Sequence, residues 1–197
     1  RYGNAASIFG YGSTSRKSVI GAKETIAETL GADTNEIYFT AGGTESDNWA
    51  LKGVYEAYQD KGRHIITTKI EHHAVLHTCE YLEKRGAQIT YLDVDADGVV
   101  DLEQLKKAIR PDTILISVMY ANNEIGTLQP IREIGEIAAS GGILFHTGRT
   151  AGERQACRNG KYTGHRGHGG GSKTCMSYYG GENEERDGNE GLFDCTD

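Results

Sequence analysis

TILISVMYANNEIG (Thr113 to Gly126) is the stretch that decides the fold. Its first eight residues form a short, strongly apolar run, and the polar loop ANNEIG follows directly. A run of this length that ends in turn-forming residues predicts a buried strand. Strands buried on both faces occur mainly in parallel sheets that carry helices on either side. The stretch therefore indicates an α/β protein.

The segments on either side repeat this pattern of short apolar runs and amphipathic stretches. We expect strands at residues 36–40, 64–68, 88–94 and 142–146, and helices at residues 13–30, 47–58, 73–86, 101–109 and 130–140. Strands that alternate with helices of this size predict crossover units and a mainly parallel sheet. Ligands of such sheets bind at the carboxyl ends of the strands, so the loops after the strands should carry the chemistry.

The first of these loops is AGGTES (residues 41–46), which leads from an expected strand into a helix. Its glycines allow the backbone to approach a ligand closely, and the amide groups at the helix start, with the Thr44 and Ser46 hydroxyls, suit a phosphate. The alternative is an ordinary glycine-rich turn with a threonine cap. The loop matches neither of the common nucleotide-binding glycine motifs.

Two further loops present polar side chains at the same edge. EHHA places His72 and His73 after a strand, where one of them could stack on an aromatic cofactor or transfer protons, or could simply cap a helix. ANNEIG offers two asparagines and a glutamate that could hydrogen-bond a ring substituent, or could form an Asx turn.

Two near-matches to metal and phosphate motifs are rejected. DVDADGVVDLEQ (Asp93 to Gln104) resembles a calcium loop, but its twelfth residue is Gln104 instead of Glu, so we expect a strand–turn–helix connection there. GHGGGSKT (Gly167 to Thr174) lacks the second glycine of a phosphate loop and no apolar strand precedes it. The spacing of His165, His168, Cys157 and Cys175 fits no common zinc pattern, so we expect no metal site.

Composition narrows the class of protein and reveals a break. The net charge of −7 argues against a nucleic-acid-binding surface. No apolar run has the length of a membrane span, and widely spaced cysteines without a signal peptide indicate a cytoplasmic protein with reduced thiols. Every Val and Ile lies within residues 1–147, whereas residues 148–197 are rich in Gly. We expect this tail to be disordered or irregular, because it has little apolar surface to bury.

Taken together and in order, the loops carry a resemblance to a known family. The first half of the cysteine desulfurases, of the aminotransferase class V group, resembles this chain at YGNAAS (residues 2–7), TAGGTESDN (40–48), EHHAVLHT (71–78), ANNEIGTLQPI (121–131) and GILFHT (142–147). The chain begins at Arg1, which suggests that its front is missing. The resemblance implies a partial, three-layer large domain of a fold type I pyridoxal-phosphate enzyme over residues 1–147.

The resemblance also implies an activity and its residues. Enzymes of this family are homodimers that remove sulfur from L-cysteine, leaving L-alanine. They pass the sulfur as a persulfide to a sulfur acceptor or an iron–sulfur scaffold protein. By resemblance, Gly43 and Thr44 would bind the phosphate of pyridoxal 5'-phosphate, His72 would stack on its ring and assist proton transfers, and Asn123 would hydrogen-bond the ring hydroxyl. A selenocysteine lyase or a class V aminotransferase is the alternative.

The family pattern stops after Thr147. Gly148 stands where the family has the aspartate that pairs with the ring nitrogen, and Ala151 stands where it has a glutamine. Lys173 is a poor match to the Schiff-base lysine, and Cys175 and Cys195 come too early for the sulfur-accepting cysteine. Codons for Gly-Arg-Thr-Ala-Gly, moved by one base, can encode Asp-Ala-Gln-Gln-Ala. The sequence therefore favours a reading-frame shift near Gly148, which would leave this chain inactive.

Overall fold

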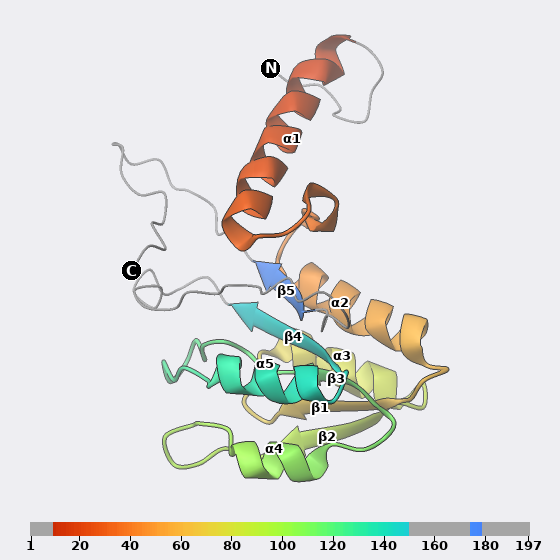
Figure 1. Ribbon diagram of the computed structural model, residues 1–197, viewed down its shortest axis with the longest axis vertical. Helices are drawn as coiled ribbons and strands as arrows, with labels where there is room; N and C mark the ends of the chain where they lie inside the picture. The colour runs from red at the N-terminus through yellow and green to blue at the C-terminus, as the bar shows by residue number, and fades with distance from the viewer. Residues whose placement is uncertain (1–9, 150–173, 179–197) are drawn as a thin grey trace. The chain divides into compact units, whose positions relative to one another are not determined.

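The computed structural model describes residues 10–149 and 174–178, and the side chains of residues 12–148. The chain divides into two compact units (Figure 1). The described part of the first unit covers residues 10–39, and that of the second covers residues 40–149 and 174–178. The second unit contains all the loops that the sequence analysis singled out.

The first unit consists of helix α1 (Gly10–Leu30) and the short helix η1 (Thr34–Glu36). As predicted, α1 ends at Gly31, whose φ of 63° is readily reached only by a residue without a Cβ. The Ala32 amide then donates to the carbonyl of Ala27 at 2.8 Å, which closes the helix end. Asp33 caps η1 by accepting from the Asn35 amide at 2.9 Å.

The strand predicted at residues 36–40 is wrong. Ile37 has extended backbone angles (φ −94°, ψ 124°), but no strand of the described sheet pairs with this segment. Tyr38 and Phe39 are 64% and 52% exposed, so the apolar residues that suggested a buried strand are not covered by the described residues. An extended segment becomes a strand only when a neighbour accepts and donates its backbone hydrogen bonds.

The second unit is a parallel sheet with helices on both faces, as predicted. Its strands run in the order β2-β1-β3-β4-β5, and each neighbouring pair is parallel. In chain order its elements are α2 (Gly43–Tyr58), β1 (His64–Thr68), α3 (His73–Glu83), β2 (Gln88–Leu92), α4 (Leu102–Ala108), β3 (Thr113–Ser117), α5 (Ile131–Ser140), β4 (Leu144–Arg149) and β5 (Thr174–Tyr178).

Apolar side chains that alternate along the central strands contribute to two separate hydrophobic cores. Ile66, Ile116 and Phe145 pack on one face with residues of α4 and α5, whereas Ile65 and Leu115 pack on the other face with residues of α2 and α3. Because side chains of a strand point alternately to opposite faces, consecutive isoleucines in β1 serve different cores. Figure 1 shows these two helical layers on either side of the sheet.

The order of the strands reverses between β1 and β3, which are neighbours in the sheet. The chain leaves β1 through α3, which packs on one face, and leaves β3 through α5, which packs on the other. The two loops therefore diverge from adjacent strand ends, and the region between them, called the crevice below, is the usual ligand position in open α/β sheets.

The predicted strand–turn–helix connection over residues 93–104 is confirmed. The Asp95 side chain accepts from the amides of Asp97 (2.9 Å) and Val99 (2.8 Å), and Gly98 has a φ of 80°. The acidic residues of this segment therefore form a turn between β2 and α4.

None of the helices in the described ranges is long and apolar enough to span a membrane. The segment GHGGGSKT and the side chains of Cys157, His165, His168 and Cys175 lie outside the described residues, except for the backbone at positions 174 and 175. Lys173, Cys195 and most of the tail also lie outside them, so the predictions for these residues stay predictions.

Candidate functional site

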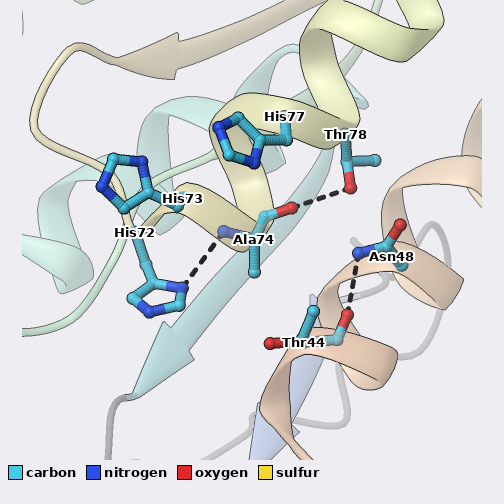
Figure 2. A pocket seen from close by; sticks show the side chains of 7 residues that line it. All are labelled: Thr44, Asn48, His72, His73, Ala74, His77 and Thr78. Carbon is cyan, nitrogen blue, oxygen red and sulfur yellow. Dashed lines mark hydrogen bonds between the residues drawn. The ribbon is translucent and has the colours of Figure 1, made fainter.

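The crevice at the ends of β1 and β3 is the place where the predicted site residues should meet. Thr44 and His72 do meet: both line one pocket of about 260 Å³ between the first turns of α2 and α3 (Figure 2). The other residues that line it are Asn48, His73, Ala74, His77 and Thr78. Two side chains predicted from separate loops therefore face one cavity.

The start of α2 has the features of an anion site. Its N-cap is Gly42, which has no side chain to bond the amides of the first turn. Gly43 and Thr44 are the first helical residues. Amide groups in the first turn of a helix point away from it and carry a partial positive charge. The Ser46 hydroxyl, by contrast, lies 2.6 Å from the hydroxyl of Thr40, so it already has a partner within the protein.

His72 combines both interpretations that the sequence left open. It is the N-cap of α3, and its Nδ1 accepts a hydrogen bond from the Ala74 amide at 3.1 Å (Figure 2). A ring nitrogen that accepts cannot also carry the proton, so the neutral ring has its proton on Nε2. The cap thus fixes both the tautomer and the orientation of a half-buried imidazole.

Asn123 is not brought into the pocket. It is exposed in the loop after β3, next to the buried Asn122. The Asn122 side-chain oxygen accepts from the amides of Glu124 (2.8 Å) and Ile125 (3.1 Å), which is an Asx turn. The alternative interpretation of ANNEIG is therefore correct for Asn122, and the turn leaves Asn123 at the edge of the sheet.

Sequence reasoning missed a buried carboxyl group at the centre of the crevice. Glu71 is 7% exposed, and its Oε1 accepts from the Met119 amide at 2.7 Å and from the Thr68 hydroxyl at 3.2 Å. Burial, with a smaller contribution from the nearby Asp47, raises the pKa of Glu71 to about 8, although the hydrogen bonds from Met119 and Thr68 act to lower it. A carboxyl group in this setting keeps its proton at neutral pH.

A buried pair of polar side chains, Asp47 and His146, lies between α2 and β4. His146 Nε2 is 3.5 Å from Asp47 Oδ1, and His146 Nδ1 is 2.9 Å from the hydroxyl of Ser117. Both residues are largely withdrawn from water. This pair ties the helix that begins at Gly43 to the ends of β3 and β4.

The motifs contained a signal for these missed residues. Asp47 and Glu71 stand inside the quoted motifs, and His146 stands in the last predicted strand. Each is a polar residue next to an apolar run at the edge where ligands bind. What the sequence did not reveal was their partners.

Gly148 lies where the resemblance requires a carboxylate. It is part of β4, and its carbonyl accepts from the Tyr120 amide at 3.0 Å, which places it beside the loop after β3. A glycine supplies no side chain there. The preceding hydroxyl, Thr147 Oγ1, is buried without a hydrogen-bond partner among the described residues.

Comparisons with known proteins agree with the architecture. The family model for aminotransferase class V matches residues 1–151. The chain is 60% identical over 146 residues to cysteine desulfurase IscS of Methanosarcina thermophila, and 54% identical over 146 residues to cysteine desulfurase IscS of Clostridium botulinum. Each match covers 74% of this chain, but only 36% and 37% of the relatives, so the chain spans little more than a third of their length.

Solved structures give the same result. A NifS-like protein superposes with a TM-score of 0.71 at 44% identity, covering 74% of this chain and 40% of that protein. A structure described as SspA in complex with cysteine has a TM-score of 0.71 at 41% identity, covering 75% of this chain and 42% of that protein.

Proposed function

The chain belongs to the aminotransferase class V family, and we propose that its described sheet is part of a cysteine desulfurase that uses pyridoxal 5'-phosphate. The observation that carries this proposal is the meeting of Thr44 and His72 at one pocket beside the reversal in strand order. The parent enzyme would cleave the carbon–sulfur bond of L-cysteine and leave L-alanine. Its sulfur would remain on the enzyme as a persulfide.

The residues at this edge suit one side of the cofactor. The amides at Gly43 and Thr44, with the Thr44 hydroxyl, provide donors for a phosphate. The His72 imidazole, fixed by its bond to Ala74, presents a flat ring with its proton on Nε2. Asn123 does not line this pocket, so its proposed bond to the ring hydroxyl is supported by the family resemblance alone. When bound, pyridoxal phosphate supplies an electron sink, while the protein supplies the anchor and the orientation.

At one position the residue present does not fit pyridoxal phosphate. Gly148 has no carboxylate for a ring nitrogen, and Lys173 lies outside the described residues. The residues after Thr147 therefore have no proposed catalytic role in this chain. In the proposal they are read in a shifted frame, which agrees with the family match ending at residue 151. The chain then divides into a partial cofactor-binding domain, residues 1–147, and an out-of-frame tail, residues 148–197, and is inactive as it stands.

Sequencing the DNA from codon 140 onward tests the boundary. The proposal expects an adjacent frame at codon 148 that reads Asp-Ala-Gln-Gln-Ala. Codons that cannot give aspartate in either adjacent frame would exclude a frame shift. This result bears on the tail alone and leaves the proposal for residues 1–147 to be tested separately.

The substrate and partners follow from the same proposal. L-cysteine as substrate is supported by the desulfurase names of the relatives and by the cysteine complex of SspA. A sulfur acceptor or an iron–sulfur scaffold protein would receive the sulfur, and the parent enzyme would act as a cytoplasmic homodimer. A selenocysteine lyase or a class V aminotransferase remains the second candidate, because the family model covers the whole class.

One experiment separates these activities. The gene, read in the frame that continues the family pattern, is expressed at full length and incubated with L-cysteine, L-selenocysteine or an amino donor with a keto acid. The proposal expects L-alanine and sulfide from cysteine in the presence of a reducing thiol. A Thr44→Ala variant should require more pyridoxal phosphate for half-saturation. Alanine formed only from selenocysteine, or only exchange of amino groups, would overturn the desulfurase assignment.

A further inference from the structure

Two side chains join the loops that leave β1 and β3. Glu71, in the loop after β1, accepts from the Met119 amide at 2.7 Å. In the opposite direction, the Asn122 side-chain amide donates to the Ile70 carbonyl at 2.8 Å. Each bond connects a side chain of one loop to the backbone of the other, across 48 and 52 residues of sequence.

These bonds lie just beyond the residues through which β1 and β3 pair. β1 and β3 pair from His64 to Ile66. The segments that follow the two strands then lead to helices on opposite faces of the sheet. Beyond these pairs, backbone bonds hold each loop to its other neighbouring strand: the Lys69 amide donates to Leu92 at 3.0 Å, and the Tyr120 amide donates to Gly148 at 3.0 Å. The bonds that join the two loops to each other are those of the Glu71 and Asn122 side chains. Glu71 and Asn122 are each 7% exposed, and their side chains join the two loops there.

The two residues that the loops present lie immediately beyond these bonds. His72 follows Glu71, and Asn123 follows Asn122. His72 and Asn123 each stand one residue beyond a bond that joins the loops, so these bonds limit how the two residues can move relative to each other. The spacing between the two loops therefore affects the separation of the His72 imidazole, which lines the pocket, from the Asn123 amide, which lies outside it.

We propose that Glu71 and Asn122 are positioning residues, which together hold His72 and Asn123 at a fixed separation across the crevice between β1 and β3. This inference rests on the proposed function, because pyridoxal phosphate is the ligand that both presented side chains would contact. Withdrawing a carboxyl group from water costs free energy, which the hydrogen bond from the Met119 amide partly offsets. An apolar residue of the same size could not accept that hydrogen bond.

The charge state of Glu71 is compatible with this role. Its raised pKa means that the side chain is protonated at neutral pH, and a protonated carboxyl still accepts at Oε1. Glutamine has the same shape and the same acceptor without the acidic proton. A Glu71→Gln variant should therefore preserve the bond to Met119, whereas Glu71→Ala removes it.

Nuclear magnetic resonance of the isotope-labelled 197-residue chain tests the proposal. The signals to follow are the His72 ring nitrogens and the Asn123 side-chain amide, each assigned by its own substitution. The variants are Glu71→Gln, Glu71→Ala and Asn122→Ser, which keeps an oxygen for the turn but not the donor to Ile70. Tyr55→Phe is the matched control, because it removes one bond between a side chain and a distant backbone carbonyl, that of Arg85, elsewhere in the unit.

The proposal expects effects that cross between the loops. Glu71→Ala should shift the Asn123 signals and Asn122→Ser should shift the His72 signals, while Glu71→Gln and Tyr55→Phe leave both in place. If each substitution affects only its own loop, the proposal is overturned. Should Glu71→Ala not fold, Asn122→Ser alone decides, through the His72 ring.

Titration with pyridoxal phosphate supplies the functional readout. If the wild-type chain binds it, Asn122→Ser should weaken binding roughly tenfold, because misplaced contacts of about 1 Å have large effects, and Glu71→Gln should not. Unchanged binding in Asn122→Ser would overturn the positioning role. If the wild-type chain binds no pyridoxal phosphate, the cofactor proposal for this chain fails. The positioning proposal is then decided by the resonance shifts alone: shifts that cross between the loops support it, and shifts confined to the substituted loop overturn it.

Discussion

His146 Nε2 lies 3.5 Å from Asp47 Oδ1, in a setting where the histidine is 1% exposed. The other ring nitrogen of His146 lies 2.9 Å from the Ser117 hydroxyl. The imidazole of His146, which belongs to β4, therefore contacts one side chain from α2 and one from β3. Buried polar groups of this kind hold elements in one arrangement only when their partners are all present.

Asp47→Ala should therefore destabilise the protein. Asp47→Ala removes the contact between the carboxylate and the buried His146 Nε2, and truncating one partner of a buried polar pair costs about 1–3 kcal/mol in the free energy of unfolding. Urea denaturation followed by circular dichroism measures the loss. Asp47→Asn, which keeps an acceptor oxygen, should recover part of it.

The matched control for Asp47 is an exposed ion pair on α5. Arg132 Nε lies 3.2 Å from Glu136 Oε1, and both side chains are exposed. Exposed pairs of this type contribute about 0–1 kcal/mol. Glu136→Ala should therefore change the urea midpoint less than Asp47→Ala does, and an equal or larger change would contradict the importance of the buried pair.

The pH dependence of stability should reveal Glu71. Its pKa is about 8 in the folded protein, against 4.5 as its ordinary value, so between these pH values the folded state holds a proton that the unfolded chain has released. Stability from this group therefore falls as pH rises from 4.5 to 8, with a slope of at most about 1.4 kcal/mol per pH unit. Urea midpoints measured across this range for the wild type and Glu71→Gln isolate the effect.

Other buried groups titrate in the same range, so the comparison with Glu71→Gln is essential. Burial and the nearby Arg110 lower the pKa of His64, whose contribution to stability is lost as pH falls below 6.5. Asp47, whose charge contributes to the raised pKa of Glu71, is present in both proteins. The difference between wild type and Glu71→Gln should favour the variant increasingly toward pH 8. A difference that does not change with pH would contradict the raised pKa.

Local patterns predicted the strands and loops of the second unit well. HIITT was predicted as a strand and is β1, and Pro130 was predicted to open a helix and is the N-cap of α5. These features depend on residues close in sequence, such as alternating apolar side chains and turn formers. The segment at residues 36–40 had the same local signal, yet a strand also needs a partner, which local sequence does not specify.

The site was only partly predictable for the same reason. Thr44 and His72 were chosen as residues at strand ends, and the sheet brings them to one pocket. The bonds from Glu71 to Met119 and from Asn122 to Ile70 join residues about fifty positions apart, and depend on β1 and β3 being neighbours. Strand order arises from tertiary packing, so no motif within either loop could identify the partner.

Gly62 should be intolerant of a side chain. A Cβ at this position would collide with the backbone carbonyl of Asp112, which is rigidly held because it also accepts from the His64 amide at 3.1 Å. Gly62→Ala must therefore displace the entry to β1 or β3, and we expect a loss of about 1–3 kcal/mol in the free energy of unfolding.

Gly21 is the control for Gly62, because a Cβ there meets nothing within 4 Å. Alanine is also the better helix former, so Gly21→Ala in α1 should be neutral or stabilising by up to about 1 kcal/mol. Thermal unfolding of both variants provides the measurement. Similar midpoints for the two would show that the entry to β1 adapts to the extra carbon.

Replacing His72 can separate its structural role from its proposed role toward the cofactor. His72→Ala removes the acceptor for the Ala74 amide, and loss of an N-cap costs about 0.5–2 kcal/mol. Asparagine is among the best N-cap residues but has no aromatic ring, so His72→Asn should retain wild-type stability. In the full-length, in-frame enzyme, both variants should bind pyridoxal phosphate more weakly, because both lack the ring. If His72→Asn binds it as tightly as the wild type does, then His72 serves only to cap α3.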